Sequence, residues 1–300
     1  MDGGENKKVV RIPETLKAEI IKNKQGYRGN ESLKTKRLLK ELNLNTVCES
    51  ALCPNRGRCF KDEVATFMIL GDRCTRACTF CAVDRRPPAP PDAAEIENVA
   101  KAVRQLKLKY VVLTSPTRDD LPDGGAGHFR LVIEAINKTC PDTKIEALIP
   151  DFKGSSGSLK EILTPGLTVL AHNLETIERL YAKVRSGADY RRSLELIGRV
   201  KEMSNGIYSK SGIMAGLGET FDEVVSLMKD LRAVDCDIFT IGQYIAPSVK
   251  NYAVKEYIDN QIFEKYKKAA LELGFKAVAS GALVRSSFLA ETTFNEARLF

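Results

Sequence analysis

The chain has 300 residues, 43% hydrophobic and 28% charged, which is typical of a globular protein and excludes a disordered, collagen-like or coiled-coil chain. No run reaches the roughly 18 apolar residues of a membrane span, and charges interrupt the first twenty residues, so we expect a cytoplasmic protein without a membrane anchor. The net charge of +7 is concentrated in residues 1–60, with 13 Lys/Arg and 7 Asp/Glu. This surplus is either a solvated basic arm or a docking surface for an acidic partner, and without interleaved aromatic residues it does not favour nucleic acid.

Apolar runs alternate with amphipathic segments along the chain after a helical N-terminal region. Six runs have the length of buried parallel strands: residues 64–70, 109–114, 144–149, 167–171, 212–215 and 237–241. The segments between them have helical periodicity: residues 93–108, 128–139, 159–163, 175–203 with a break near Gly187, and 219–234. A helix over 259–273 and a strand over 275–279 follow.

Six β-α units predict an α/β fold with a parallel sheet. We expect a partial (β/α)6 TIM-type barrel with a helical N-terminal extension and a short C-terminal extension, and with its site at the carboxyl ends of the strands. The expected regions are an N-terminal extension over 1–61, a barrel core over 62–245 and a C-terminal extension over 246–300.

Six of the eight cysteines fall between residues 48 and 81. They form two triplets: Cys48, Cys53 and Cys59, followed by Cys74, Cys78 and Cys81. Such density in a long chain without a secretory signal predicts metal chemistry rather than disulfides. Cys140, at a predicted helix end, and Cys236, at the start of an apolar strand, are interpreted as core thiols that behave as small hydrophobic residues.

The second triplet has the spacing C-x3-C-x2-C and directly follows the first predicted strand. A structural zinc site uses four ligands, whereas three thiolates on a four-iron cluster leave one iron open to a non-protein ligand. This spacing resembles the radical S-adenosylmethionine (SAM) superfamily, in which the methionine end of SAM binds the open iron and electron transfer yields a 5′-deoxyadenosyl radical. Zinc is the less favoured alternative, since Phe80 precedes the last cysteine as in that superfamily.

Residues at three other strand ends resemble the cofactor-binding elements of this superfamily. Thr114 and Ser115, which end the second strand, match groups for the methionine end of SAM. Asn173 and Glu175, which close the fourth strand, match ribose or methionine contacts, with helix capping as the alternative. The glycine-rich run after the fifth strand resembles a segment near the adenine, although a tight strand-to-helix turn explains it equally well. The candidate cofactor contacts are Thr114, Ser115, Asn173, Glu175, Gly216 and Glu219.

The first triplet, spaced C-x4-C-x5-C, belongs to an ordered set of motifs between about residues 30 and 290. The others are Thr114-Ser115-Pro-Thr-Arg118-Asp119-Asp120-Leu-Pro-Asp-Gly-Gly, Lys210-Ser211-Gly212, Gly242-Gln243-Tyr244 and Val284-Arg285-Ser286-Ser287. Together these motifs resemble the lipoyl synthase family. Phe60, Asn251 and Phe288 depart from the usual pattern of that family, but none of them replaces a cluster ligand.

The resemblance implies a sulfurtransferase that converts a protein-bound octanoyl-lysine into a lipoyl group by inserting sulfur at C6 and C8. It implies SAM and two [4Fe–4S] clusters, with Ser287 as the labile fourth ligand of the auxiliary cluster that the first triplet holds and that supplies the sulfur. No further catalytic residue is expected, because no side-chain base reaches the pKa of an alkyl C–H bond. The implied partners are an octanoylated carrier, either the glycine cleavage H protein or the E2 lipoyl domain of a 2-oxoacid dehydrogenase, and an electron donor such as ferredoxin or flavodoxin.

Two other functions stay open at this point. An electron-transfer protein with two clusters would explain both triplets but not the six β-α units, and another radical SAM enzyme would use its auxiliary cluster for a different reaction. We interpret His128 and His172 as hydrogen-bonding residues rather than catalysts. The run Arg118-Asp119-Asp120 is a candidate for closing the active site, with surface ion pairing as the alternative.

Overall fold

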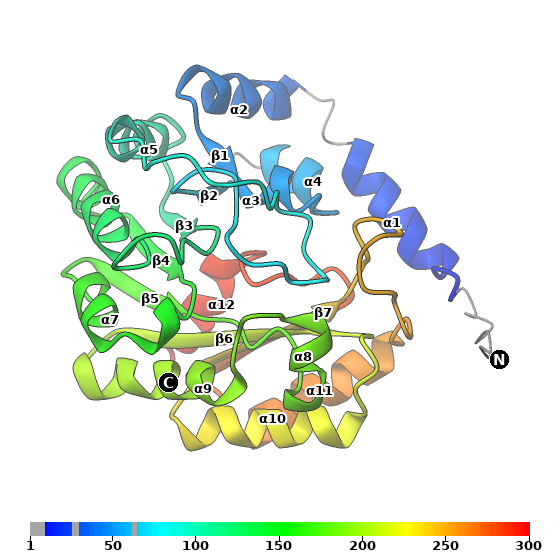
Figure 1. Ribbon diagram of the computed structural model, residues 1–300. Coiled ribbons are helices and arrows are strands. Elements are labelled where there is room, and N and C mark those ends of the chain that lie inside the picture. Colours follow the sequence, from blue (N-terminus) through cyan, green and yellow to red (C-terminus); the bar gives the residue numbers. More distant parts are fainter. Residues whose placement is uncertain (1–9, 26–29, 62–64) are drawn as a thin grey trace.

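The computed structural model describes residues 10–25, 30–61 and 65–300 and contains an eight-stranded sheet (Figure 1). Its strands are β1 (Asn45–Thr46), β2 (Thr66–Met68), β3 (Tyr110–Thr114), β4 (Lys144–Leu148), β5 (Leu167–Ala171), β6 (Tyr208–Ala215), β7 (Ile238–Gln243) and β8 (Ala277–Gly281). They lie side by side in chain order; β1 pairs antiparallel with β2, and every later pair is parallel. Because β1 and β8 form the two edges, the sheet is not closed, and the predicted partial barrel is confirmed.

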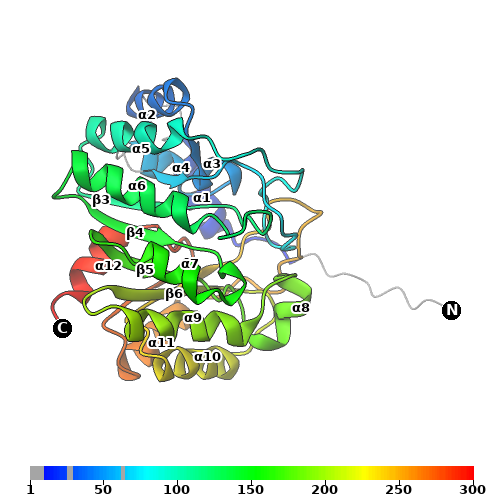
Figure 2. The same cartoon turned by 60° about the vertical axis from the view of Figure 1, so that its left-hand side comes forward.

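Within the part of the chain that the structure describes, six helices cover the outer face of the sheet. They are α5 (Ala94–Gln105), α6 (Ala126–Thr139), α7 (Ser156–Ile162), α9 (Tyr190–Met203), α10 (Phe221–Ala233) and α11 (Asn260–Glu272). Each contacts the next in this order, and Figure 2 shows them stacked along the strands. The β-α alternation that the sequence predicts therefore folds as a continuous outer layer, as expected for parallel crossovers.

Buried apolar side chains hold this layer to the sheet. All residues of β2 and β3 are buried, and helix faces such as Val99 and Val103 of α5 pack onto them. The helix ends carry caps: the Thr220 hydroxyl accepts from the Glu223 backbone N–H, and the Glu223 carboxylate accepts from the Thr220 N–H, which makes a capping box at the start of α10.

The six predicted strands correspond to β2 through β7, with two differences. β6 begins at Tyr208 rather than at residue 212, because its first residues are polar and hide the strand from a hydrophobicity pattern. Lys210 is nevertheless buried and donates to both carboxylate oxygens of Glu146 on β4, at 2.8 and 2.9 Å. The first predicted strand begins at Val64, which lies outside the described residues.

The predicted helix over 175–203 is divided into shorter elements. A 3-10 turn (Glu178–Leu180) leads into α8 (Tyr181–Val184). α9 begins after Gly187, whose φ of +80° lies in the connection, so the helical pattern breaks near the expected position. Another 3-10 turn, Phe152–Gly154, precedes α7.

The two extensions contact each other and the open side of the sheet. The first contains α1 (Glu14–Gln25), α2 (Asn30–Glu41), α3 (Val47–Ser50) and α4 (Arg56–Lys61), and the second contains α12 (Ala290–Ala297). Leu16 and Ile20 of α1 pack on Leu283, whose carbonyl accepts from Asn55 Nδ2 at 2.6 Å. Because α12 contacts the first residues of β3, β6, β7 and β8, it lies at the amino ends of the strands (Figure 2). We keep the division at 1–61, 62–245 and 246–300 as a proposal; residue 62 lies outside the described residues.

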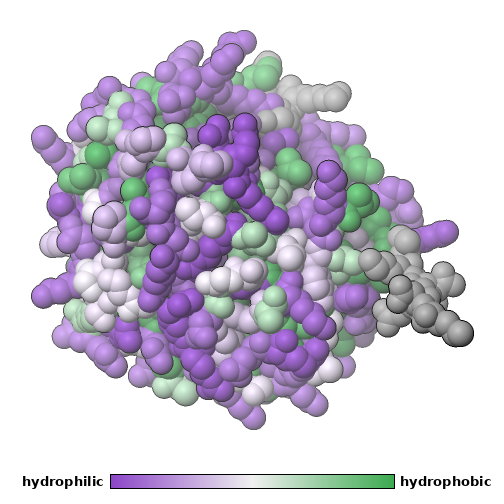
Figure 3. Space-filling view, viewed as in Figure 1, coloured by the Kyte–Doolittle hydropathy of each residue, from purple (hydrophilic) through white to green (hydrophobic). Residues whose placement is uncertain are grey.

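Within the described ranges, every helix is too short or too polar to cross a bilayer. The face of the molecule in Figure 3 is mostly hydrophilic, with hydrophobic residues scattered over it.

Candidate functional site

The second cysteine triplet lies in the loop after β2, at the carboxyl edge of the sheet. Cys74, Cys78 and Cys81 line one cavity of about 240 Å³. Side chains from the ends of β3 and β5 and from the turn after α8 also line this cavity. They include Thr114, Ser115, Asn173, Glu175 and Arg185. Four of the six candidate cofactor contacts therefore face the predicted cluster ligands.

Backbone N–H groups surround two of these thiols. Cys74 Sγ accepts from the N–H groups of Arg76 at 3.4 Å and Thr117 at 3.3 Å, and Cys81 Sγ accepts from Val83 at 3.4 Å. Such donors stabilise sulfur that carries negative charge and tune the potential of an iron–sulfur cluster. Burial raises the pKa of Cys78 and raises that of Cys81 to about 11, so these thiols are protonated at neutral pH until a metal takes the thiolate.

The spacing of potential ligands differs from that of a site for one ion. Among the residues that the structure describes, no three Cys, His, Asp or Glu side chains are grouped closely enough to hold a single metal ion. A four-iron cluster binds each thiolate through a different iron, so its ligands lie further apart than those of a zinc site. The separation of the three thiols therefore favours the cluster over zinc.

The end of β3 offers a hydroxyl that lacks a protein partner. Thr114 Oγ1 donates to the Leu148 carbonyl at 2.9 Å, whereas the buried Ser115 Oγ has no hydrogen-bond partner among the described residues. Leaving a buried hydroxyl unpaired costs about 1–3 kcal/mol. Since this hydroxyl lines the same cavity as the thiols, it fits the polar end of a bound cofactor.

Asn173 and Glu175, at the end of β5, form a polar pair in the cavity. Asn173 Nδ2 donates to Glu175 Oε1 at 3.0 Å, and its Oδ1 accepts from Ser286 Oγ at 3.0 Å. The next helical turn has Ile177 as its N-cap, so helix capping does not account for the pair. Glu175 has a φ of +66°, a strained conformation for a residue with a side chain, and burial raises its pKa. Strain of this kind collects at functional sites.

Arg185 is a cavity residue that the sequence analysis missed. Its guanidinium donates to Tyr181 Oη at 3.0 Å and to Ser193 Oγ at 3.2 Å, and its charge acts on both Cys78 and Glu175. No motif marked it, because it follows a short helix far from both cysteine triplets. A buried cation opposite a buried carboxylate suits a ligand with both an ammonium and a carboxylate group.

The glycine-rich run after β6 forms a tight turn. The Glu219 carboxylate accepts from the backbone N–H groups of Gly216 and Leu217. Gly216 has a φ of +95°, and a Cβ there would approach Gln243 Nε2 and the Glu256 carbonyl to 2.3 Å. The turn accounts for both Gly216 and Glu219, which do not line the 240 Å³ cavity. Their contact with a cofactor stays a prediction.

The first triplet gathers on the open side of the sheet. Cys48 belongs to α3, Cys59 belongs to α4, and Cys53 lies between these helices. Cys59 and Ser287 line a second cavity, of about 140 Å³, together with Thr66, and Cys48 interacts with Thr66. Burial, with a smaller contribution from Cys53, raises the pKa of Cys48 to about 11. The structure thus brings a residue from the far end of the chain to the predicted auxiliary ligands.

The remaining candidates have structural partners. Arg118 is 1% exposed and donates to the Leu70 carbonyl at 2.9 Å and to Asp120 at 2.8 Å, so surface ion pairing does not describe it. His172 Nδ1 lies 2.8 Å from the Ile149 carbonyl, and burial lowers its pKa to about 3, which keeps the ring neutral. His128 Nε2 lies 2.8 Å from Glu95. Cys236 is fully buried, and its pKa is raised to about 12, as expected for an inert core thiol.

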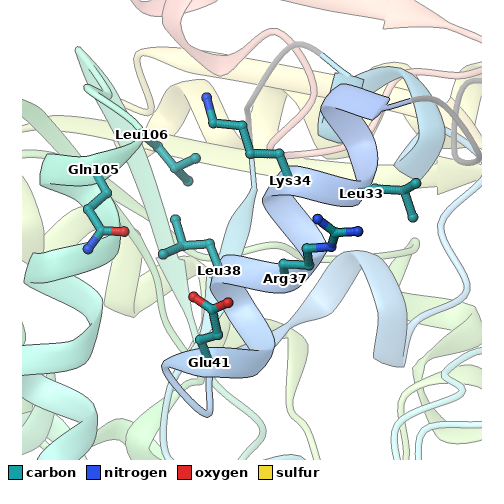
Figure 4. A pocket seen from close by; sticks show the side chains of 7 residues that line it. All are labelled: Leu33, Lys34, Arg37, Leu38, Glu41, Gln105 and Leu106. Carbon is teal, nitrogen blue, oxygen red and sulfur yellow. The ribbon is translucent and has the colours of Figure 1, made fainter.

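A larger groove, of about 410 Å³, lies between α2 and α5 (Figure 4). Its lining residues are Leu33, Lys34, Arg37, Leu38, Glu41, Gln105 and Leu106. Leu38 points toward Leu106 across the groove. None of the predicted site residues lines it, and we therefore place the chemistry in the smaller cysteine-lined cavity.

Residues 68–231 match the family model of the radical SAM superfamily. Two solved structures share the fold: methylornithine synthase (PylB), with a TM-score of 0.54 and 17% identity over 86% of this chain and 74% of that one, and HydG, a maturase of the [FeFe]-hydrogenase, with a TM-score of 0.54 and 13% identity over 95% of this chain and 70% of that one.

Curated relatives match nearly the whole chain. The lipoyl synthase of Caldicellulosiruptor saccharolyticus is 54% identical over 86% of this chain and 90% of its own length. Those of Caldanaerobacter subterraneus subsp. tengcongensis and Geobacter metallireducens are 49% and 48% identical, over 96% and 93% of this chain and 99% and 96% of their own lengths. The chain belongs to the lipoyl synthase family of the radical SAM superfamily.

Proposed function

We propose that this enzyme inserts two sulfur atoms, at C6 and C8, into a protein-bound octanoyl-lysine and so forms a lipoyl group. The family supports an enzyme that uses SAM and iron–sulfur chemistry. The observation that carries the finer proposal is the presence of two separate thiol sets. One lines the 240 Å³ cavity, and Cys59 of the other lines the 140 Å³ cavity together with Ser287. One set suits radical formation, and the other suits storage of the sulfur.

Cys74, Cys78 and Cys81 would hold one [4Fe–4S] cluster and leave one iron open. When bound, the two clusters and SAM supply a radical that breaks an unactivated C–H bond and the sulfur that replaces the hydrogen. Glu175 and Arg185 offer opposite charges to the ammonium and carboxylate groups of the methionine end, and the unpaired Ser115 hydroxyl offers a further hydrogen bond.

Cys48, Cys53, Cys59 and Ser287 would hold the second, auxiliary cluster. A serine oxygen is a hard ligand in a set of soft thiolates, so it is the ligand expected to dissociate most readily. Its segment is held by packing, since the Arg58 guanidinium lies 5.2 Å from the centroid of the Phe288 ring. This contact would hold the backbone next to Ser287 in place, with the Ser287 hydroxyl as the fourth ligand of the cluster.

The proposed substrates follow from this reaction. The acyl group is presented by an octanoylated carrier, the glycine cleavage H protein or an E2 lipoyl domain, and electrons come from a ferredoxin or flavodoxin, with the cytoplasm as the compartment. We propose no role in nucleic acid or membrane binding.

Anaerobic turnover of the reconstituted enzyme tests the proposal. With an octanoylated carrier peptide, SAM and a reductant, we expect 5′-deoxyadenosine and a peptide whose mass corresponds to a lipoyl group. An electron-transfer protein would release no 5′-deoxyadenosine. Release of 5′-deoxyadenosine without any sulfur-containing product would contradict sulfur insertion and favour another radical reaction.

A further inference from the structure

Arg76, inside the cysteine loop, is buried between two carboxylates from other loops. Its Nε donates to Asp119 Oδ2 at 2.8 Å, and its second terminal nitrogen donates to Asp119 Oδ1 at 3.0 Å and to Asp151 Oδ1 at 2.6 Å. The Arg76 side chain is 7% exposed. Asp119 follows β3 and Asp151 follows β4, so one guanidinium joins the cysteine loop to the loops after the next two strands.

Contacts other than that with Arg76 also hold Asp151 in place. It is completely buried, and its second oxygen accepts from Arg192 Nε of α9 at 3.0 Å. Burial opposes its ionisation, but the hydrogen bond and charge of Arg76 lower the pKa of Asp151 well below its usual range. The next residues, Phe152 and Lys153, have φ values of +46° and +52°, and such strained backbone persists only where its surroundings determine it.

Asp119 belongs to a second set of contacts with the cysteine loop. Its backbone N–H donates to Thr75 Oγ1 at 3.0 Å, and the Thr75 N–H donates to the Thr117 carbonyl at 3.0 Å. The Thr117 N–H in turn donates to Cys74 Sγ. Side-chain and backbone bonds together therefore set the distance between the three thiols and Ser115, two residues before Thr117.

We propose that Arg76 is a positioning residue that, through Asp119 and Asp151, fixes the cysteine loop relative to the cofactor groups at the end of β3. This inference rests on the proposed function, because it assigns Arg76 a role in aligning the cluster with SAM. The planar guanidinium bonds to both carboxylates at once, which the point charge of a lysine cannot do in the same geometry. Arg76 also lies close enough to Cys78 that its charge opposes the rise in the pKa of that thiol that burial causes.

The substitution Arg76→Lys tests this role, with Arg86→Lys as the matched control. Arg86 lies in the same loop region, but it is 68% exposed and pairs with Asp84. For Arg76→Lys we expect an iron content equal to that of the unmodified protein, a SAM affinity about tenfold weaker, and a smaller change in the EPR spectrum of the reduced cluster when SAM is added. Arg86→Lys should match the unmodified protein in all three measurements.

Asp119→Asn is the second variant, because Asp119 is 24% exposed and its replacement perturbs folding less than a change at Asp151. We expect a smaller loss of SAM affinity in the same direction, again at full iron content. Unchanged SAM affinity and EPR response in both variants would overturn the proposal, and so would a loss of affinity that merely follows a loss of iron. Failure of the unmodified protein to bind a cluster or SAM would instead overturn the proposed function.

Discussion

The two cysteine sets differ in the length of chain that builds them. Cys74, Cys78 and Cys81 lie in one loop. N–H groups of this loop donate to two of the thiols, and Thr117 of the loop after β3 donates to Cys74. The other set comes from two short helices, and its proposed serine ligand comes from the C-terminal extension, which is joined to them by a hydrogen bond between residues 228 positions apart. The thiols of one site therefore come from a single short loop, to which Asn251 of the C-terminal extension also donates, whereas those of the other come together by packing between distant segments. The two sites should fail in different ways.

Cys78→Ala should give the largest effect. Removing one of three thiolates from the loop takes away the proposed open-iron site, so we expect cleavage of SAM to be abolished. Cleavage of SAM is measured by the release of 5′-deoxyadenosine during anaerobic turnover. Cys140→Ala, which changes a cysteine at the end of α6, should retain cleavage. Cleavage by Cys78→Ala at the unmodified rate would show that this loop does not generate the radical.

Cys53→Ala should separate the two activities. We expect some 5′-deoxyadenosine but no lipoyl product, because the proposed sulfur source is lost while the radical site remains. Replacing Cys48, Cys53 and Cys59 together should leave about half of an expected eight irons. Product mass and iron analysis measure these outcomes. Lipoyl formation by Cys53→Ala at the unmodified rate would show that sulfur comes from elsewhere.

Ser287→Ala should have an intermediate effect. The three thiolates can keep the auxiliary cluster, so iron content should hold, yet we expect lipoyl formation to slow roughly tenfold because the labile ligand is missing. Ser286→Ala is the neighbouring control, although it also removes a hydrogen bond to Asn173 and should affect SAM binding instead. Equal rates for Ser287→Ala and the unmodified enzyme would argue against serine ligation.

Asn55→Ala should act on the hydrogen bond that joins the two extensions. It leaves the buried Leu283 carbonyl without its donor, at a cost of about 1–3 kcal/mol in the free energy of unfolding. We expect the auxiliary cluster to be lost faster on dilution, while the radical-forming cluster is retained. Asn23→Ala, which removes only the bond from Asn23 Nδ2 to Asn55 Oδ1, is the milder control. Equal loss of both clusters would contradict the difference between the sites.

Added salt should have the smallest effect. If the basic surplus of the N-terminal extension binds an acidic carrier, the affinity for the whole carrier should weaken with salt. The reason is that screening limits the range of interaction between exposed charges to about 8 Å at physiological ionic strength. An octanoylated peptide too short to reach that surface should show little dependence. Equal salt sensitivity of both substrates would identify the surplus as a solvated surface. Lys7, Lys8 and Arg28, part of this surplus, lie outside the described residues.

Local patterns explain which features the sequence could predict. The apolar strands and the two cysteine spacings are patterns within short stretches of the sequence. The strands of the structure lie at the positions that hydrophobicity predicts. β6 starts earlier than predicted because Lys210 is buried by pairing with Glu146, a contact between distant residues. Arg185 and Arg76 were missed for the same reason, since only the folded chain shows which charges surround the cavity.

The hydrogen bond from Asn55 to Leu283 also has a consequence for the order of assembly. Ribosomes add about 5–20 residues per second, so Leu283 is made roughly 10–45 seconds after Asn55. The cysteine loop, the partners of Arg76 and Arg192 of α9 are made well before that time. During synthesis the three thiols of the loop and these contacts are thus available before the last segment of the auxiliary site. The bonds from Asn251 to the Cys81 carbonyl and from Ser286 to Asn173 complete the first cavity only when the C-terminal extension is made.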